Sequence, residues 1–183
     1  MSAAPRWVLF DWGGTLMSED GPLDLPMALW PEVHAVEGAH EALATLAARY
    51  RIGVATNASV SPRNMIEVAL GRVGLRDWVQ EVFCYADIGA RKDEDAFWRA
   101  VLERTGAEPA DVVMIGDSLA ADVLAPRQFG IASIWFNEGG RQAPDARGVP
   151  VIERLADAPA AVARAFAAAQ SAPVPRRQAP GQR

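Results

Sequence analysis

The chain has 183 residues, half of them hydrophobic, and its formal net charge is −5. This length suits one domain with a sizeable core, and the apolar content excludes a disordered protein. The acidic balance argues against a nucleic acid partner, because phosphate backbones favour clustered lysine and arginine. No apolar stretch is long enough to cross a bilayer, and no signal pattern precedes the first apolar run. We therefore expect a cytoplasmic protein with no membrane partner, in which the single cysteine, Cys84, stays reduced.

Strand-like apolar runs alternate with segments of helical period along the chain. The expected strands are residues 7–11, 52–56, 82–86, 112–115 and 131–136, and the expected helices lie near 38–49, 62–72, 94–105, 119–128 and 159–169. This alternation predicts an α/β fold: one Rossmann-like domain over residues 1–170, with a parallel sheet of about five strands and helices on both faces. The last residues, 171–183, are rich in Pro, Gln and Ala and predict a disordered tail.

One long irregular segment, residues 17–36, interrupts this pattern after the first strand. It contains three prolines, several acids and a histidine, His34. Long loops inside compact domains are usually functional or mobile. Because the segment emerges beside Asp11, we expect it to form a flap over the reaction site at the end of the first strand and to take the place of a large cap domain.

Polar side chains suited to phosphate chemistry follow four of the predicted strands. Asp11 ends the first strand, Thr56 and Asn57 end the second, Lys92 lies just beyond the third, and Asp117 follows the fourth. Parallel strands bring their carboxyl ends to one crevice, so these side chains should meet. A carboxylate can attack phosphorus to form an aspartyl-phosphate, while a divalent cation and an ammonium neutralise the phosphate oxygens. Oxygen ligands favour Mg²⁺ over zinc.

Two of these segments resemble motifs of the haloacid dehalogenase (HAD) superfamily. Val8-Leu9-Phe10-Asp11-Trp12-Gly13-Gly14-Thr15 resembles the first motif, Asp-x-Asp-x-Thr after an apolar lead-in, and Ile115-Gly116-Asp117 followed by Asp122 resembles the fourth. Thr56 and Lys92 stand where the second and third motifs are expected. The resemblance covers residues 6–136 and is to members with a minimal cap, because neither usual insertion point has room for a large one.

The resemblance implies a role for each matching residue. Asp11 would be the nucleophile, with Thr56 and Lys92 completing the catalytic set. The substrate phosphate would contact Gly14, Thr56, Asn57 and Lys92. A Mg²⁺ ion would be bound by Asp11, by the carbonyl of Gly13 and by Asp117, with Asp122 bracing the site or binding through water.

Gly13 departs from the family pattern, in which the residue at this position is an aspartate. That aspartate protonates the leaving group and then activates water, and loss of such a general acid–base costs ~10²–10⁴ in rate. The loss falls hardest on alkyl phosphates and less on acyl or aryl phosphates. Three outcomes stay open: a flap acid or His34 substitutes, the substrate is an activated phosphate, or the protein binds phosphate with little turnover.

We therefore expect a Mg²⁺-dependent phosphatase, slow or restricted to activated phosphates. A catalytically weak phosphate-binding or regulatory relative is the alternative, and a dehalogenase-type hydrolase ranks below it because Asp117 and Asp122 indicate a metal site. A phosphonoacetaldehyde hydrolase is rejected because Lys92 is the only lysine. A receiver domain is disfavoured by the order of the motifs. The partner would be a small-molecule phosphate or a larger phosphorylated substrate, and a homo-oligomer stays open.

Overall fold

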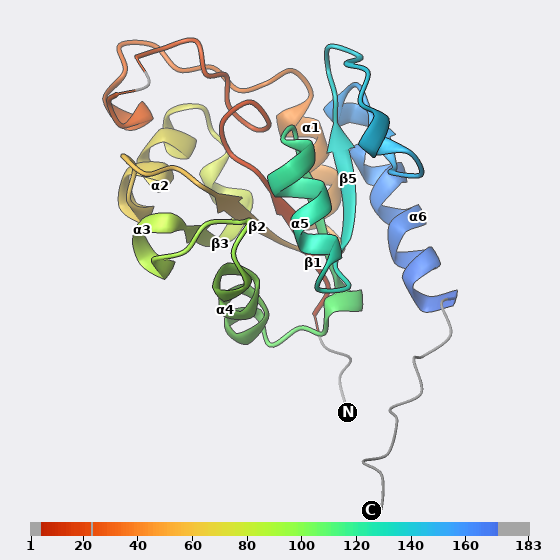
Figure 1. The fold of residues 1–183 in the computed structure, drawn as a ribbon. Helices are drawn as coiled ribbons and strands as arrows, with labels where there is room; N and C mark the ends of the chain where they lie inside the picture. The colour runs from red at the N-terminus through yellow and green to blue at the C-terminus, as the bar shows by residue number, and fades with distance from the viewer. Residues whose placement is uncertain (1–4, 23, 172–183) are drawn as a thin grey trace, which may run out of the picture.

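The computed structural model describes residues 5–22 and 24–171, within which six strands form one parallel sheet (Figure 1). The strand order is β3-β2-β1-β4-β5-β6, so the first strand lies near the middle of the sheet. The chain builds outward from β1 in one direction through β2 and β3, and in the other through β4, β5 and β6. The expected α/β class is confirmed, and the reversal between β1 and β4 is the kind of switch point at which such sheets bind ligands.

The strands alternate with helices along the chain. The strands are β1 (Trp7–Phe10), β2 (Arg51–Thr56), β3 (Val79–Cys84), β4 (Val112–Gly116), β5 (Ala132–Phe136) and β6 (Val151–Ile152). The α-helices are α1 (Ala39–Ala47), α2 (Arg63–Arg72), α3 (Tyr85–Ile88), α4 (Asp95–Thr105), α5 (Ala125–Arg127) and α6 (Ala158–Ser171). Between them lie a π-helix, η4 (Leu119–Leu124), and the 3-10 turns η1 (Met27–Leu29), η2 (Arg76–Trp78), η3 (Pro109–Asp111), η5 (Pro144–Ala146) and η6 (Leu155–Asp157).

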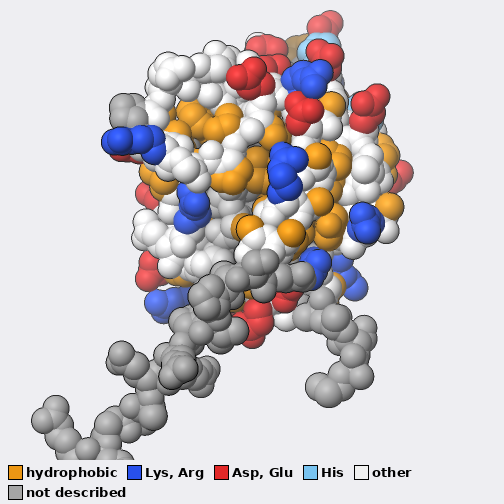
Figure 2. Space-filling view, turned by 90° about the vertical axis from the view of Figure 1, so that its right-hand side faces the viewer, with side chains coloured by type: hydrophobic (Ala, Val, Ile, Leu, Met, Phe, Trp, Pro, Cys, Tyr) orange, Lys and Arg blue, Asp and Glu red, His pale blue; other side chains and the backbone are white. Residues whose placement is uncertain are grey.

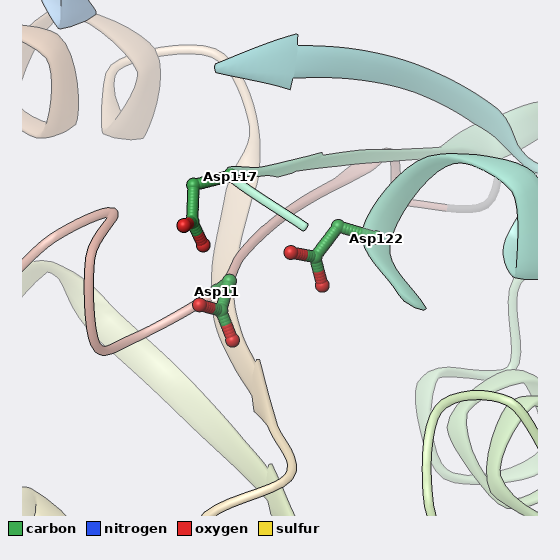
Figure 3. Close-up of side chains that lie close together, drawn as sticks. All are labelled: Asp11, Asp117 and Asp122. Carbon is green, nitrogen blue, oxygen red and sulfur yellow. The ribbon is translucent and has the colours of Figure 1, made fainter. Parts of the chain in front are cut away.

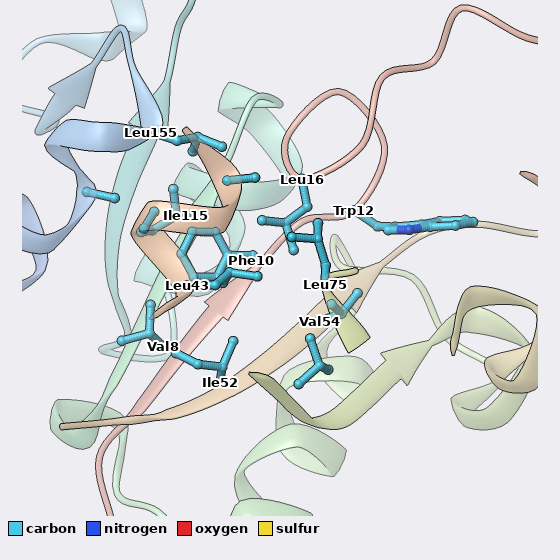
Figure 4. Packing of buried hydrophobic residues seen from close by; sticks show 14 of the residues in the cluster. Val8, Phe10, Trp12, Leu16, Leu43, Ile52, Val54, Leu75, Ile115 and Leu155 are labelled. Carbon is cyan, nitrogen blue, oxygen red and sulfur yellow. The ribbon is translucent and has the colours of Figure 1, made fainter. Parts of the chain in front are cut away.

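The sheet is buried on both faces, as its continuous apolar strands predict. Val8 and Phe10 point to one face, where they join a cluster that includes Leu43 of α1 (Figure 4). Trp7 and Leu9 alternate to the other face and belong to the cluster that contains residues of α4. Because successive side chains of a strand point to opposite faces of the sheet, those of β1 pack into two separate hydrophobic cores.

Three local features differ from the expectations. The expected strand 82–86 begins earlier and ends at Cys84, where the chain turns into α3. The expected helix 119–128 is a π-helix followed by a short α-helix, and Pro126, which has no N–H, lies at their junction. The sheet also gains a sixth strand, β6, whose two residues pair with β5.

The irregular segment 17–36 runs across the carboxyl-end edge of the sheet (Figure 1). Apart from residue 23 it is described, and it contains only the turn η1 and isolated bridges. Met17 forms a parallel bridge with Gly13 and an antiparallel bridge with Ala35, so both ends of the segment are tied to the domain. We call residues 17–36 the flap.

Three observations relate to the expected tail and to the membrane and nucleic acid partners that the sequence argues against. Of the expected tail, 171–183, only Ser171 at the end of α6 lies within the described residues. Among the helices that the structure describes, none is both long enough and apolar enough to cross a bilayer. On the face shown in Figure 2, Lys and Arg side chains are scattered, and several acids lie together at the upper edge. This face offers no continuous basic surface.

Candidate active site

The side chains expected at the strand ends lie around one cavity of about 410 Å³. Because every strand is parallel, every carboxyl end reaches this edge of the sheet. The cavity is lined by Asp11, Gly13, Thr56, Asn57, Lys92, Asp117 and Asp122, and also by Trp12, Glu19, Leu25, Met27, Trp30, Ala58, Ser59, Val60, Ser61, Ser118 and Ala121.

Lys92 is the buried cation at the floor of this cavity, with 2% of its surface exposed. Its ammonium donates hydrogen bonds to Asp11 Oδ1 and Asp122 Oδ1, both at 2.5 Å, and to the carbonyl of Ala55 at 3.0 Å. These three acceptors use all three ammonium hydrogens. Two side chains hold the backbone of Lys92 in place. Its N–H donates a hydrogen bond to Asn57 Oδ1, and its carbonyl accepts one from Trp98 Nε1.

Three carboxylates lie close together in this cavity (Figure 3). Asp11 follows β1, Asp117 follows β4, and Asp122 comes from η4. One oxygen from each lies within 4.8 Å of the others. Asp122 is fully buried, and its Oδ2 accepts the N–H of Ser118 at 2.9 Å.

Glycines make room for this cluster. A Cβ at Gly116 would lie 2.6 Å from Cβ of Asp122, so only glycine lets the carboxylate of Asp122 approach the end of β4. Gly14 has a φ of +73° and lies against the carboxylate of Asp117. Its N–H, expected at the phosphate, instead donates to the carbonyl of Met17 at 2.8 Å.

The charges in the cluster perturb one another. Burial and the neighbouring Asp11 raise the pKa of Asp122 to about 7, against the opposing effect of Lys92. Burial and Asp11 also raise the pKa of Asp117. Burial alone would lower the pKa of Lys92, but Asp11 and Asp122 raise it. Three acids therefore face one ammonium, and the remaining negative charge suits a hard divalent cation such as Mg²⁺ with oxygen ligands.

Thr56, the last residue of β2, and Asn57, which follows it, complete the inner wall of the cavity. Thr56 is buried, and its Oγ1 accepts the N–H of Ala58 at 3.1 Å, so its hydroxyl hydrogen is still available for donation. Asn57 uses its Oδ1 to accept from Lys92 N–H at 2.8 Å. Both residues thus keep donor groups beside the three acids.

The backbone of Asp117 is fixed by three neighbours. Its N–H donates to Thr15 Oγ1 at 3.2 Å, and its carbonyl accepts from Trp135 Nε1 at 2.9 Å and from Arg141 Nη2 at 3.1 Å. Trp135 lies in an adjoining cavity that shares Asp117 and Ser118 with the main one.

Glu19 of the flap is the acid that the sequence did not single out. Its side chain occupies the space next to Gly13 into which a side chain at position 13 would project. Glu19 is exposed as a residue, and the partial burial of its carboxyl group together with Asp11 and Asp117 raises its pKa, while Lys92 acts in the opposite direction. Its position depends on how the flap folds back across the end of β1, and this loop conformation cannot be predicted from the spacing of residues in the sequence.

The two histidines and the cysteine lie outside the main cavity. His34 is an exposed flap residue beside Glu32, in a separate small hollow. His40 Nε2 donates a hydrogen bond to the carbonyl oxygen of Val73 and packs edge-on against Trp78. Cys84 is free and buried.

Comparisons with known proteins agree on one family of hydrolases. Residues 26–130 match the model for haloacid dehalogenase-like hydrolases. The chain is 28% identical to pyrimidine 5′-nucleotidase YjjG of Escherichia coli (strain K12), over 59% of this chain and 47% of that protein. It is 33% identical to a phosphoglycolate phosphatase of Rhodospirillum rubrum, over 58% of this chain and 43% of that protein. These matches span less than half the length of the two relatives. Among solved structures, a 2-haloacid dehalogenase of Pseudomonas syringae pv. Tomato DC3000 superposes with a TM-score of 0.62 at 28% identity, covering 73% of this chain and 55% of that one.

Proposed function

The chain belongs to the haloacid dehalogenase-like hydrolase family, and from this premise we propose a Mg²⁺-dependent phosphatase that works through an aspartyl-phosphate on Asp11. The observation that carries the proposal is the state of the Asp11 carboxylate. Its Oδ1 is held by Lys92 at 2.5 Å, and its Oδ2 accepts no hydrogen bond from any described residue. A buried carboxylate that is oriented through one oxygen leaves the other free to act as a nucleophile.

The metal would be held by Asp11 and Asp117, with the carbonyl of Gly13 as a third ligand. Asp122 would brace the site from behind, since both of its oxygens already accept hydrogen bonds. When bound, Mg²⁺ supplies positive charge next to the phosphate oxygens. The excess of acids over the single ammonium supports this assignment.

The protein's own groups account for the bond changes. Asp11 Oδ2 attacks phosphorus while the ester P–O bond breaks and its electron pair leaves with the departing oxygen. Thr56 and Asn57 donate hydrogen bonds that orient the transferring phosphoryl group. Water then attacks the aspartyl-phosphate at phosphorus, which releases inorganic phosphate and restores the Asp11 carboxylate. Lys92 keeps Asp11 oriented throughout through its hydrogen bond to Oδ1.

Small phosphate monoesters are the substrates that we propose. The relatives are named for a pyrimidine 5′-nucleotide and for phosphoglycolate, and both are phosphate esters of alkyl oxygens. The flap supplies the outer wall of the cavity through Leu25, Met27 and Trp30. It would act as a minimal cap that contacts the part of the substrate outside the phosphate.

The test is release of phosphate from pyrimidine 5′-monophosphates, phosphoglycolate and p-nitrophenyl phosphate, with and without Mg²⁺. We expect turnover that EDTA removes and that Asp11→Asn abolishes. Mass spectrometry of the rapidly quenched enzyme should show a phosphoryl adduct on Asp11. Turnover that persists in Asp11→Asn would refute the mechanism.

Two other activities have one supporting observation each. Gly13 favours a protein that binds phosphate with little turnover, and phosphate binding by calorimetry in the absence of any hydrolysis would support that function. The 28% identity to a 2-haloacid dehalogenase structure favours dehalogenation. Halide release from 2-chloropropionate in the presence of EDTA would support the dehalogenase. The metal-type acid cluster argues against it.

A further inference from the structure

The place next to Gly13 is filled by a carboxylate from another part of the chain. A Cβ built on Gly13 would lie 2.6 Å from Glu19 Cδ, which is well inside van der Waals contact. Gly13 is not among the glycines with positive φ, so its backbone would accept any residue. A side chain at position 13 would therefore have to displace the side chain of Glu19, whereas the backbone conformation would not oppose it.

The backbone holds Glu19 in this place. The bridge from Gly13 to Met17 and the hydrogen bond from Gly14 N–H to the Met17 carbonyl fold the start of the flap back onto the end of β1. The next residue, Ser18, donates its N–H to the carbonyl of His34 at 2.9 Å. Glu19 therefore leaves a fixed segment of backbone, with only its side chain to be positioned.

The carboxyl group of Glu19 faces the reaction cavity and has no partner. It lines the cavity together with Asp11 and Asp117, and its charge interacts with both of them and with Lys92. No hydrogen bond or ion pair to Glu19 is present among the described residues. An unpaired carboxyl group beside the proposed nucleophile is placed to exchange a proton with substrate or water.

The other titratable groups near the cavity lack this combination. Asp122 is fully buried and holds Lys92 and the Ser118 N–H. Asp20 accepts a hydrogen bond from the Ser18 hydroxyl and lies with His34 in a small hollow lined by flap residues. Among the described titratable residues of the flap, Glu19 alone lines the main cavity.

We propose that Glu19 is the general acid and base of the phosphatase reaction, in place of a side chain at position 13. This inference rests on the proposed function. As Asp11 Oδ2 attacks phosphorus, the ester oxygen departs with its bonding electron pair and takes the proton of the Glu19 carboxyl group. The Glu19 carboxylate then removes a proton from the water that attacks the aspartyl-phosphate, and is ready for the next turnover.

The test compares two esters in the Mg²⁺-loaded enzyme. A nucleoside 5′-monophosphate has a poor alkoxide leaving group, whereas p-nitrophenyl phosphate releases a stable phenolate. Glu19→Gln should lower kcat for the alkyl ester by ~10²–10⁴, the contribution of a general acid–base, and should affect the formation of the phosphoryl-enzyme from the aryl ester far less. A stopped-flow burst of p-nitrophenolate isolates that first step. Glu32→Gln, the same change on an exposed flap glutamate, is the matched control and should leave both esters unaffected.

A rescue experiment separates a chemical role from a structural one. Glu19→Ala empties the space beside Gly13, and adding Gly13→Asp should then recover a large part of the turnover of the alkyl ester. Gly13→Asp alone should give no gain, because the two side chains would compete for the same space. Equal losses in the rate of phosphoryl-enzyme formation from both esters in Glu19→Gln, or no loss with either ester, would overturn the role of Glu19 while leaving the phosphatase intact. Turnover that is insensitive to Asp11→Asn would overturn the phosphatase itself, and this inference with it.

Discussion

Lys92 should make a large electrostatic contribution to the free energy of unfolding. It is the partner of two buried carboxylates, and breaking a buried pair by removing one partner costs about 3–5 kcal/mol. We expect Lys92→Met to lower the free energy of unfolding of the metal-free protein by that amount, measured by urea denaturation. Lys92→Arg should not restore the stability, because the planar guanidinium cannot place three donors where the ammonium does.

A surface pair provides the comparison for this prediction. Arg99 and Asp95 form an exposed ion pair on α4, with side chains 75% and 68% exposed. Exposed pairs of this kind contribute about 0–1 kcal/mol, so Arg99→Met should change the unfolding free energy little. A similar loss in both variants would show that the burial of Lys92 has no special energetic role.

Asp122 predicts how the metal-free protein responds to pH. Its pKa is about 7 in the folded protein, above the ordinary value of 3.8, so the folded state holds an extra proton between these values. Stability should therefore fall as pH rises from about 4 to about 7. Thermal melts in EDTA across this range should show the decline, and Asp122→Asn should flatten it. A profile that rises with pH in the wild type but not in Asp122→Asn would contradict the assignment.

At the scale of elements, one side chain of α2 joins the middle of the flap to the domain. Arg72 donates hydrogen bonds to the carbonyls of Ala28 and Trp30, at 3.0 and 2.6 Å, and to that of Pro31 at 3.0 Å. Hydrogen bonds to a charged group contribute about 1.5–3 kcal/mol. We expect Arg72→Ala to speed hydrogen exchange across the flap and to raise KM for the alkyl ester.

The exposed residue Arg104 near the end of α4 is the control for this prediction. Arg104→Ala removes the same charge from a helix that does not touch the flap, and exchange in the flap should stay as in the wild type. If exchange were unchanged in Arg72→Ala as well, the bridges at Met17 would be enough to hold the flap.

The strands and helices also show how much of the fold and of the candidate site could be predicted from the sequence. Strands β1 to β5 were predicted because each is a buried apolar run, and Asp11, Thr56, Lys92 and Asp117 could be assigned to one crevice because parallel strands share an edge. Strand β6 could not be predicted, since two residues carry no period. Nor could the π-helix that presents Asp122, because its wider turn departs from the ordinary helical repeat.

The flap marks the limit of that reasoning. Its length and its acids were evident, but the residue that fills the space at Gly13 was not. The choice of Glu19 over Asp20 follows from bridges and backbone hydrogen bonds that join the flap to β1. These contacts belong to one particular loop conformation, and they cannot be predicted from the composition of the flap or from the spacing of its residues.

For the whole molecule, the acid cluster predicts that a divalent ion stabilises the fold. A ligand at one hundred times its Kd adds about 2.7 kcal/mol to the unfolding free energy. For a domain of this size, that corresponds to a rise in Tm of about 5–10 °C. Differential scanning fluorimetry with Mg²⁺ should show the rise, Asp117→Ala should remove it, and Asp95→Ala on the exposed face of α4 should retain it. An undiminished rise in Asp117→Ala would place the ion elsewhere.

The burial of the only lysine also has a consequence for covalent labelling. Acylating reagents such as N-hydroxysuccinimide esters need an accessible, unprotonated amine, and Lys92 is enclosed and paired with two acids that raise its pKa. In the folded protein such a reagent should leave Lys92 unmodified. An acyl group on Lys92, located by peptide mass mapping, would then mark the molecules in which the site around Lys92 has opened. This protein thus carries a built-in, single-residue reporter of its own local unfolding.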